Sequence, residues 1–455
     1  MRCRAGFLAV VCAVLALVST SPAQAASGGS SSSSSASYEQ VLSAAITELQ
    51  RYWTTEFPKL YDHPYQPIPK SRIIAARPGV KIPSCQGHHT VYSDVKGNAF
   101  YCMKSNFIAY DDASLMPQLA ETFGNFAVAL VLAHEWGHAI QDRAGNDGEK
   151  TIYLEQQADC FAGAFLDHVA TSGNVLHLKP GDLEASLGAM LMLRDAPGES
   201  ASDPSAHGSA FDRIGAFQDG FEQGPEKCAS YFTNPPVLTE IPFSNQQEQL
   251  SNGDVAAKDV IPLTVNLLND FYTQVEPNYR PLSTDNIVAY DSSKPSSIPQ
   301  CGGRKLSRSE VENRVFYCID DGYVAFDDPF LEKVYKDIGD FGVASLIANP
   351  WATYVQTIQG IPGVASNALA PVFQADCYTG GWTAALFNGA LSGAQLSAGD
   401  LDETVQALLV YSRARGVSAN VPITFLRIEF FRAGFLQGYK ACDYQDVAAA
   451  AAKIK

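Results

Sequence analysis

The chain reads Leu132-Ala133-His134-Glu135-Trp136-Gly137-His138-Ala139-Ile140 in its first half. Two histidines four residues apart lie on one face of a helix, about one turn from each other. Their imidazoles can therefore bind one zinc ion, and Glu135 then lies beside the metal as a general base. The alternative is a helix with two partly buried histidines whose nitrogens are satisfied by hydrogen bonds. The surrounding sequence favours the zinc site.

The N-terminal segment has the pattern of a secretory signal. Arg2 and Arg4 precede an apolar run over residues 6–18, and Ala23-Gln24-Ala25 follows as a small-residue cleavage site. We therefore predict a signal peptide at 1–25 and a flexible Ser-rich linker at 26–37. The expected location is secreted or extracellular, with the bacterial cell envelope as the other possibility, and without membrane insertion after cleavage.

Composition limits the class of protein and its partners. The 455 residues are 46% hydrophobic and 18% charged, which is typical of one to three globular domains. Residues 1–25 contain two arginines and no acids, so their removal changes the formal net charge from −16 to −18. This acidity argues against nucleic acid as a partner.

Motifs of the first half recur in the second half in the same order, at an offset that varies only between 214 and 218. We interpret this as a duplication, with a catalytic domain that carries the candidate zinc site at 38–240 and a second copy at 241–455. A polar stretch near 234–253 is the expected linker. The matches are Cys85 and Cys102 with Cys301 and Cys318, Ala109–Asp112 with Ala325–Asp328, Gln157–Cys160 with Gln374–Cys377, Arg213 with Arg427, and Cys228 with Cys442.

The second copy has lost the zinc motif. Asn349, Pro350 and Thr353 stand where the first copy has its two histidines and the glutamate, whereas Trp351 and Gln356 still match Trp136 and Gln141. All eight histidines of the chain lie before residue 208. The second copy is therefore expected to be a degenerate, non-zinc-binding repeat that packs against the first.

The duplication also sorts the cysteines. Two of the ten leave with the signal peptide, and eight in an oxidising compartment indicate disulfides. An alternative for Cys85 and Cys102 is a structural zinc with His88 and His89, but the second copy keeps both cysteines without the histidines. The expected pairs are Cys85–Cys102, Cys160–Cys228, Cys301–Cys318 and Cys377–Cys442.

A catalytic zinc needs a third protein ligand and an open position for water. Glu155 is the candidate, and Asp159, one helical turn further, would accept the remaining N–H of His134. The second copy replaces Glu155 by Val372 but retains the aspartate, which suggests that Asp159 also has a structural task. His168 and His177 are the alternative third ligands.

Apolar spacing predicts the elements that carry these residues. We expect short strands near 91–93, 99–103 and 107–110 and helices over 115–143, 151–169, 182–193 and 210–223. Gly124 and Gly137 each cost the first of these helices about 1 kcal/mol relative to alanine. The predicted fold is mainly helical α+β, with a short hairpin or sheet in each copy.

Three runs together resemble the bacterial neutral zinc metallopeptidase family: Asn98–Cys102, Val131–His138 and Glu155–Gly163. The resemblance covers roughly residues 80–228, with a weaker echo over 296–442. It implies two tandem zincin-like metallopeptidase domains, with His134, His138 and Glu155 as ligands and Glu135 as base. Family members also tend to show His-Gly-Ser/Thr before a Gln-Arg pair. Here His207-Gly208-Ser209 is present, but the pair reads Asp212-Arg213.

These features predict a secreted zinc metallopeptidase that acts on a peptide or protein substrate. Zinc activates a water, Glu135 takes its proton, and the oxyanion is held by zinc and one protein donor. His207 is the candidate donor because its counterpart is Val421, whereas Arg213 has a persisting counterpart in Arg427. The alternatives are a secreted non-catalytic binding or scaffold protein and a zinc hydrolase with a non-peptide substrate.

Overall fold

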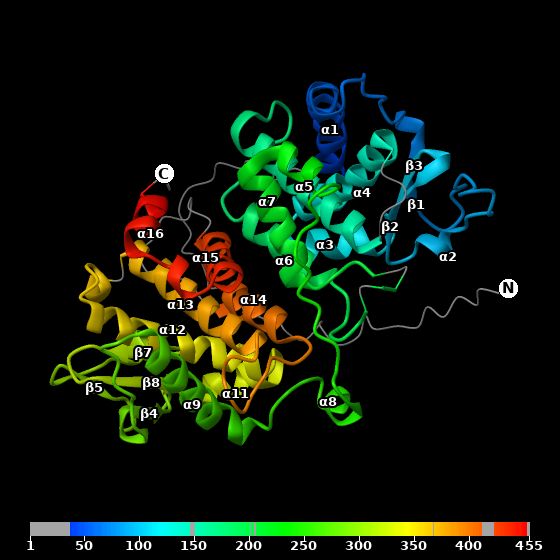
Figure 1. The fold of residues 1–455 in the computed structure, drawn as a ribbon. Helices are drawn as coiled ribbons and strands as arrows, with labels where there is room; N and C mark the ends of the chain where they lie inside the picture. The colour runs from blue at the N-terminus through cyan, green and yellow to red at the C-terminus, as the bar shows by residue number, and fades with distance from the viewer. Residues whose placement is uncertain are drawn as a thin grey trace, which may run out of the picture.

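The computed structural model describes residues 37–145, 151–200, 202–203, 206–366, 368–411 and 423–452. The predicted signal peptide, the linker up to residue 36 and Val421 lie outside these ranges. Ser37, the last linker residue, caps the first helix by accepting a hydrogen bond from the backbone N–H of Gln40. Figure 1 shows a mainly helical molecule with small sheets, an α+β arrangement.

The first half consists of α1 (Tyr38–Tyr61), β1 (Ile73–Ala76), α2 (Tyr92–Val95), β2 (Ala99–Cys102), β3 (Phe107–Asp111), α3 (Leu115–Phe123), α4 (Ala127–Ala144), α5 (Thr151–Ser172), α6 (Asp182–Met192) and α7 (Ala210–Ser230). Its sheet has the order β1-β3-β2, with β1 parallel and β2 antiparallel to β3. The buried face of α4 packs on α1, α5 and the sheet.

The second half follows the short helix α8 (Gln246–Leu250), which lies in the predicted linker. It consists of α9 (Ala257–Val275), β4 (Ile287–Tyr290), β5 (Gln300–Cys301), β6 (Arg304–Lys305), α10 (Arg308–Val311), β7 (Val315–Cys318), β8 (Tyr323–Asp327), α11 (Asp328–Asp337), α12 (Asp340–Gln359), α13 (Leu369–Phe387), α14 (Asp400–Tyr411), α15 (Ile423–Gln437) and α16 (Tyr444–Ala451). Its main sheet, β4-β8-β7, has the same parallel and antiparallel pairings as the first sheet.

Two sequence predictions of local structure are wrong. The long helix expected over 115–143 is divided into α3 and α4, because Gly124 adopts a φ of 86° and ends the first segment. The strand expected near 91–93 is instead the start of the one-turn helix α2. There the Asp94 side chain accepts a hydrogen bond from the backbone N–H of Val91. This N–H is therefore satisfied by a helix cap and not by a neighbouring strand.

The structure joins the cysteines in the four pairs that the sequence predicts, with Cα–Cα separations of 5.4–5.8 Å. Two of these disulfides join Cys85 to the end of β2 and Cys301 of β5 to the end of β7, and two join α5 to α7 and α13 to the segment after α15. A separation of 65–68 residues in the latter pairs restricts the unfolded chain strongly. Each half thus contains two disulfides, and one of them crosslinks its helical part.

The retained buried polar residues form matching hydrogen bonds in the two halves. The indole N–H of Trp136 donates to the Tyr65 hydroxyl, and that of Trp351 donates to the Tyr279 hydroxyl, at 2.8 and 2.7 Å. Gln157 and Gln374 each donate to the backbone carbonyl of the last cysteine of their half, at 2.9 and 3.0 Å. Such bonds satisfy buried groups that would otherwise be costly.

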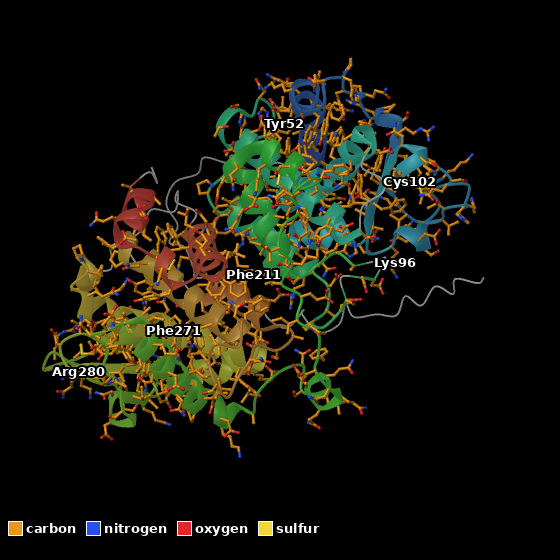
Figure 2. All side chains as sticks on the ribbon, in the orientation of Figure 1. Tyr52, Lys96, Cys102, Phe211, Phe271 and Arg280 are labelled. Carbon is orange, nitrogen blue, oxygen red and sulfur yellow. A yellow bond between two sulfur atoms is a disulfide. The ribbon has the colours of Figure 1, made fainter. Side chains whose placement is uncertain are left out.

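Helices α6 and α7 of the first half contact α14 and α15 of the second (Figure 1). Phe211, labelled in Figure 2 where the halves meet, packs its ring against Phe431 and Phe435. The Asp402 carboxylate accepts from the Phe211 backbone N–H at 2.9 Å and pairs with Arg194 at 3.1 Å. Among the described helices, none has the length and apolar character needed to cross a bilayer.

Candidate metal centre

Helices α4 and α5 bring three donor side chains together. The Nε2 atoms of His134 and His138 are 3.2 Å apart, and the Glu155 carboxylate lies 3.2 and 3.3 Å from them. Two ligands bound to zinc at 2.0–2.1 Å with a tetrahedral angle are about 3.3 Å from each other. The three donors therefore have the spacing of a zinc ligand set, and all three residues are largely buried.

Both imidazoles are oriented by the nitrogen that faces away from this group. His134 Nδ1 lies 2.7 Å from Asp159 Oδ1, and His138 Nδ1 lies 2.9 Å from Gln141 Oε1. The Gln141 amide nitrogen donates to the Leu154 carbonyl, so its oxygen is the atom that accepts. Each Nδ1 thus carries the hydrogen, and each Nε2 is left to bind a cation.

Glu135 lies between the two histidines on α4 and is also buried. Its Oε2 atom has no hydrogen-bond partner among the residues that the structure describes. Leaving a buried carboxylate oxygen unpaired is costly unless a water or ion completes its environment. A water held between Glu135 and a bound metal would do so, and the residues present therefore fit a catalytic zinc with its water.

Arg213 of α7 anchors the aspartate behind His134. Its guanidinium donates to both oxygens of Asp159, at 2.8 and 3.0 Å, and to the Leu193 carbonyl at 2.7 Å. This two-point contact leaves the Asp159 carboxylate little freedom. Arg213 therefore holds Asp159 in place, and Asp159 in turn orients His134. Its guanidinium is engaged in these contacts and does not act as an oxyanion donor.

The charges of the site favour a cation among the three donors. Burial disfavours a charged imidazole, but Asp159 and Glu155 outweigh it and raise the pKa of His134 to about 10. Burial opposes ionisation of Glu155 as well, yet both histidines hold its pKa well below the usual range. When no metal is bound, the negative charges of Asp159 and Glu155 favour the protonated form of the two histidines. A divalent cation replaces such a proton on binding.

A glycine allows the two ligand-bearing helices to approach each other. A Cβ atom at Gly137 would lie 2.7 Å from the Cα atom of Ala158 on α5. Gly137 therefore brings the Glu155 face of α5 close to the histidines, which explains a helix-weakening residue inside the motif. The matching position in α12 is Ala352, where no zinc ligands have to meet.

The other histidines considered from the sequence lie elsewhere. His168 pairs with the buried Glu48 at 2.9 Å, and His177 is exposed. The backbone of His88 bridges to Cys85 beside the Cys85–Cys102 disulfide, and the exposed side chains of His88 and His89 take no part in a metal group.

His207 is placed apart from the ligand set. Its backbone N–H donates to Asp195 at 2.7 Å, its Nδ1 lies 3.4 Å from the same carboxylate, and the side chain is 45% exposed. Within the described residues it forms no hydrogen bond or ion pair with the three ligands or Glu135. Gly208, the next residue, lies against Ile152, one turn before Glu155 on α5.

The second half keeps the framework of the centre without its donors. Arg427 contacts both oxygens of Asp376, at 2.7 and 2.6 Å, as Arg213 contacts Asp159. Asn349 donates to Asp376 at 2.8 Å from the position that His134 occupies in the first half. The Thr353 hydroxyl donates to the backbone carbonyl of Asn349. The second half therefore has an amide (Asn349), a hydroxyl (Thr353) and an alkyl group (Val372) at the positions of the three candidate zinc donors.

Gln141 and the positioning role of Arg213 were missed from the sequence. Both residues persist in the second half, as Gln356 and Arg427, and Gln356 donates to the Pro371 carbonyl as Gln141 does to that of Leu154. Their presence in both halves is the sequence signal that could have indicated a structural task. Only the geometry shows that the same side chains also hold the ligands.

Comparisons with known proteins point to the same half of the chain. Residues 8–231 match the family model described as "Putative neutral zinc metallopeptidase". The similar curated proteins include YpfJ of Escherichia coli, 29% identical over 157 residues, and Rv2575 of Mycobacterium tuberculosis, 29% identical over 160 residues. Both are named as uncharacterized. Each match covers 29% of this chain and 53–54% of the relative, so the chain spans about half the length of these relatives. No solved structure matches the chain significantly.

We expect Arg213→Lys to lower zinc affinity about 10- to 100-fold, because lysine cannot hold both oxygens of Asp159. Arg427→Lys is the matched control, since it breaks the same ion pair in the half without ligands. Both variants should lose stability in thermal unfolding. Zinc affinity, measured by competition with a chelator, should fall only for Arg213→Lys; an equal fall in both would contradict the positioning role.

We expect Gly137→Ala to push α5 away from α4 and weaken zinc binding about tenfold or more. Overpacking of this kind costs typically 1–3 kcal/mol, which exceeds the gain in helix propensity of about 1 kcal/mol. Ala352→Gly serves as the reciprocal control and should leave zinc affinity unchanged. Tight zinc binding by Gly137→Ala would show that the close contact is not required.

Proposed function

We propose that the protein is a zinc-dependent peptidase whose active site lies in its first half. The observation that carries the proposal is the orientation of the two imidazoles, whose Nδ1 atoms are held by Asp159 and Gln141 while both Nε2 atoms face Glu155. The match of residues 8–231 to a neutral zinc metallopeptidase model supports the same reaction class. The peptide or protein nature of the substrate is part of the proposal.

In the proposed mechanism His134, His138 and Glu155 would hold a zinc ion, which when bound would supply a water of lowered pKa and a Lewis acid for the scissile carbonyl. Glu135 takes a proton from the attacking water on its unpaired Oε2 and delivers it to the leaving amine. Asp159 keeps the His134 ring in the required tautomer, and Arg213 keeps Asp159 in place. The burial of Glu135 limits competing bulk water around its carboxylate.

We further propose that the second half arose by duplication and has lost the zinc site. The equal strand order of the two main sheets, the two matching pairs of disulfides and the two Arg–Asp ion pairs support this origin. The proposed units are 38–240, which acts on substrate, and 241–455, which packs on α6 and α7 as a support.

Secretion belongs to the proposal as well. It rests on the signal-like segment 1–25 and on four disulfides, which persist in oxidising compartments. N-terminal sequencing of the protein recovered from culture medium or cell envelope would test it, with a mature chain starting near residue 26 as the expected result.

Glu135→Gln should retain one zinc per chain but lose peptide hydrolysis by a factor of about 10² to 10⁴, because the amide cannot accept the proton of the water. His138→Ala should lose the zinc itself. Elemental analysis and a peptide-library assay measure the two properties separately. Zinc with ester but not peptide cleavage would favour another hydrolase class, and a wild-type protein that takes up no zinc would favour a scaffold.

His207→Ala tests the proposed oxyanion donor. If the ring leaves Asp195 and turns to the substrate, kcat should fall about 10²-fold or more while zinc content stays at one per chain. Asp195→Asn is the companion variant, because it weakens the contact of Asp195 with the His207 ring, together with its hydrogen bonds from the backbone N–H groups of His207 and Gly208. Near-normal kcat in His207→Ala would remove His207 from the mechanism and leave the other roles untouched.

A further inference from the structure

Three carboxylates converge in the second half, away from the residues used above. Asp254 precedes α9, Asp340 is the first residue of α12, and Glu403 lies in the first turn of α14. One oxygen of each lies within 4.8 Å of the other two. Asp340 and Glu403 are only 8% and 6% exposed, and the neighbouring Asp400 is buried too.

Backbone hydrogen bonds fix these carboxylates. Asp254 Oδ1 accepts from the N–H of Asp340 at 2.9 Å, and Asp340 Oδ2 accepts from the N–H of Val255 at 2.8 Å. Glu403 Oε2 accepts from the N–H of Phe341 at 2.9 Å. The second oxygen of Asp340, Oδ1, is buried and has no hydrogen-bond partner within the described part of the chain. This unpaired oxygen is an observation independent of the clustering, because a buried acceptor needs a donor or a cation.

The cluster also lacks a positive counter-charge. In the described part of the chain, no lysine, arginine or histidine forms an ion pair with Asp254, Asp340, Asp400 or Glu403. The N-terminus of α12 supplies roughly half a positive charge, which is less than one carboxylate needs. Burial raises the pKa of Glu403 well above the usual range, and the neighbouring acids raise it further. The site is therefore strongly attractive to a cation.

Other buried acids of the chain show what is missing here. Asp159 is satisfied by Arg213, and Asp402, on the same helix as Glu403, pairs with Arg194 and accepts a backbone N–H. Asp111 accepts bonds from side chains and from backbone N–H groups at the start of α3. Asp340 thus differs from these carboxylates in having an oxygen left over.

We propose that Asp254, Asp340 and Glu403 form a binding site for one Ca²⁺ ion. Calcium takes six to eight oxygen ligands at 2.3–2.6 Å, so two of its ligands are at most about 5 Å apart, as the three oxygens are. An all-oxygen, multiply charged donor set selects a hard cation over zinc. Waters complete the coordination, and Asp400 adds to the negative field from one turn away.

The ion would connect three segments that are distant in sequence. Asp254 belongs to the connection between the halves, Asp340 to the helix that replaces the zinc-binding helix, and Glu403 to a helix that contacts the first half. Gly339 leaves room for the glutamate, since a Cβ atom there would overlap the Glu403 carboxylate. Binding to the folded state alone stabilises that state.

The matching register of the first half has Asn125 and Ala185 in place of Asp340 and Glu403. The site therefore belongs to the second half only. On this assignment the half that lost its zinc donors gained a cation site of a different chemistry at the other end of the corresponding helix. The inference does not depend on peptidase activity.

The test uses the full-length mature protein, stripped with chelator and titrated with CaCl2. We expect one Ca²⁺ per chain by calorimetry and a rise in Tm of about 3 °C or more at 1 mM. His138→Ala should behave in the same way, which excludes calcium in the zinc centre as the cause. Asp402→Asn, the matched control on α14, should also keep the response.

Asp340→Asn and Glu403→Gln should each lose the Ca²⁺-dependent rise in Tm and at least tenfold in affinity. Wild-type protein that binds no Ca²⁺ would overturn the assignment, and so would an unchanged response in both variants. If one variant does not fold, the other decides. Sensitised emission of Tb³⁺, displaced by Ca²⁺ in His138→Ala, is the second measurement, and its absence would also overturn the site.

Discussion

The buried ion pair between Arg213 and Asp159 connects the fold to the candidate chemistry. It ties α7 to α5, and the free side of the same carboxylate fixes the His134 ring. The second half has the equivalent pair between Arg427 and Asp376, although no metal ligand depends on it. Breaking such a pair leaves a buried charge and costs about 3–5 kcal/mol. The candidate metal centre therefore depends on a type of contact that the second half also contains without metal ligands.

The comparison of the two aspartates shows how the histidine changes the electrostatics. Burial raises the pKa of both carboxyls, but Arg213 and His134 together bring the pKa of Asp159 below its usual value. Asp376 has Arg427 and the neutral Asn349, and its pKa stays raised. Asn349 thus makes the same hydrogen bond to its aspartate as His134 does, but it carries no positive charge. This explains how the second half has the same packing around its aspartate without a histidine at that position.

Sequence reasoning found the three side chains that the structure brings together, and for the two histidines this follows from helix geometry. Residues four apart, such as His134 and His138, share a helix face, and Glu155 was the candidate on the next predicted helix, supported by Val372 at the matching position of the second half. The division of the helix at Gly124 was not predicted, since a helical glycine and a helix-ending glycine look alike in sequence. The partner of His138, Gln141, was not predicted either, because its amide is oriented by a carbonyl of α5 that only the packed structure brings near.

The contacts between the two halves also reach Asp159, the residue that holds the His134 ring. Asp402 of α14 pairs with Arg194 and accepts the N–H of Phe211 at the start of α7. The carbonyl of Leu193, the residue before Arg194, accepts a hydrogen bond from Arg213, and Arg213 also donates to Asp159. A continuous series of charged and hydrogen-bonded groups therefore runs from the second half to the His134 ring. Because α14 also carries Glu403, the position of this helix matters both to the acidic cluster and to the residues behind the zinc ligands.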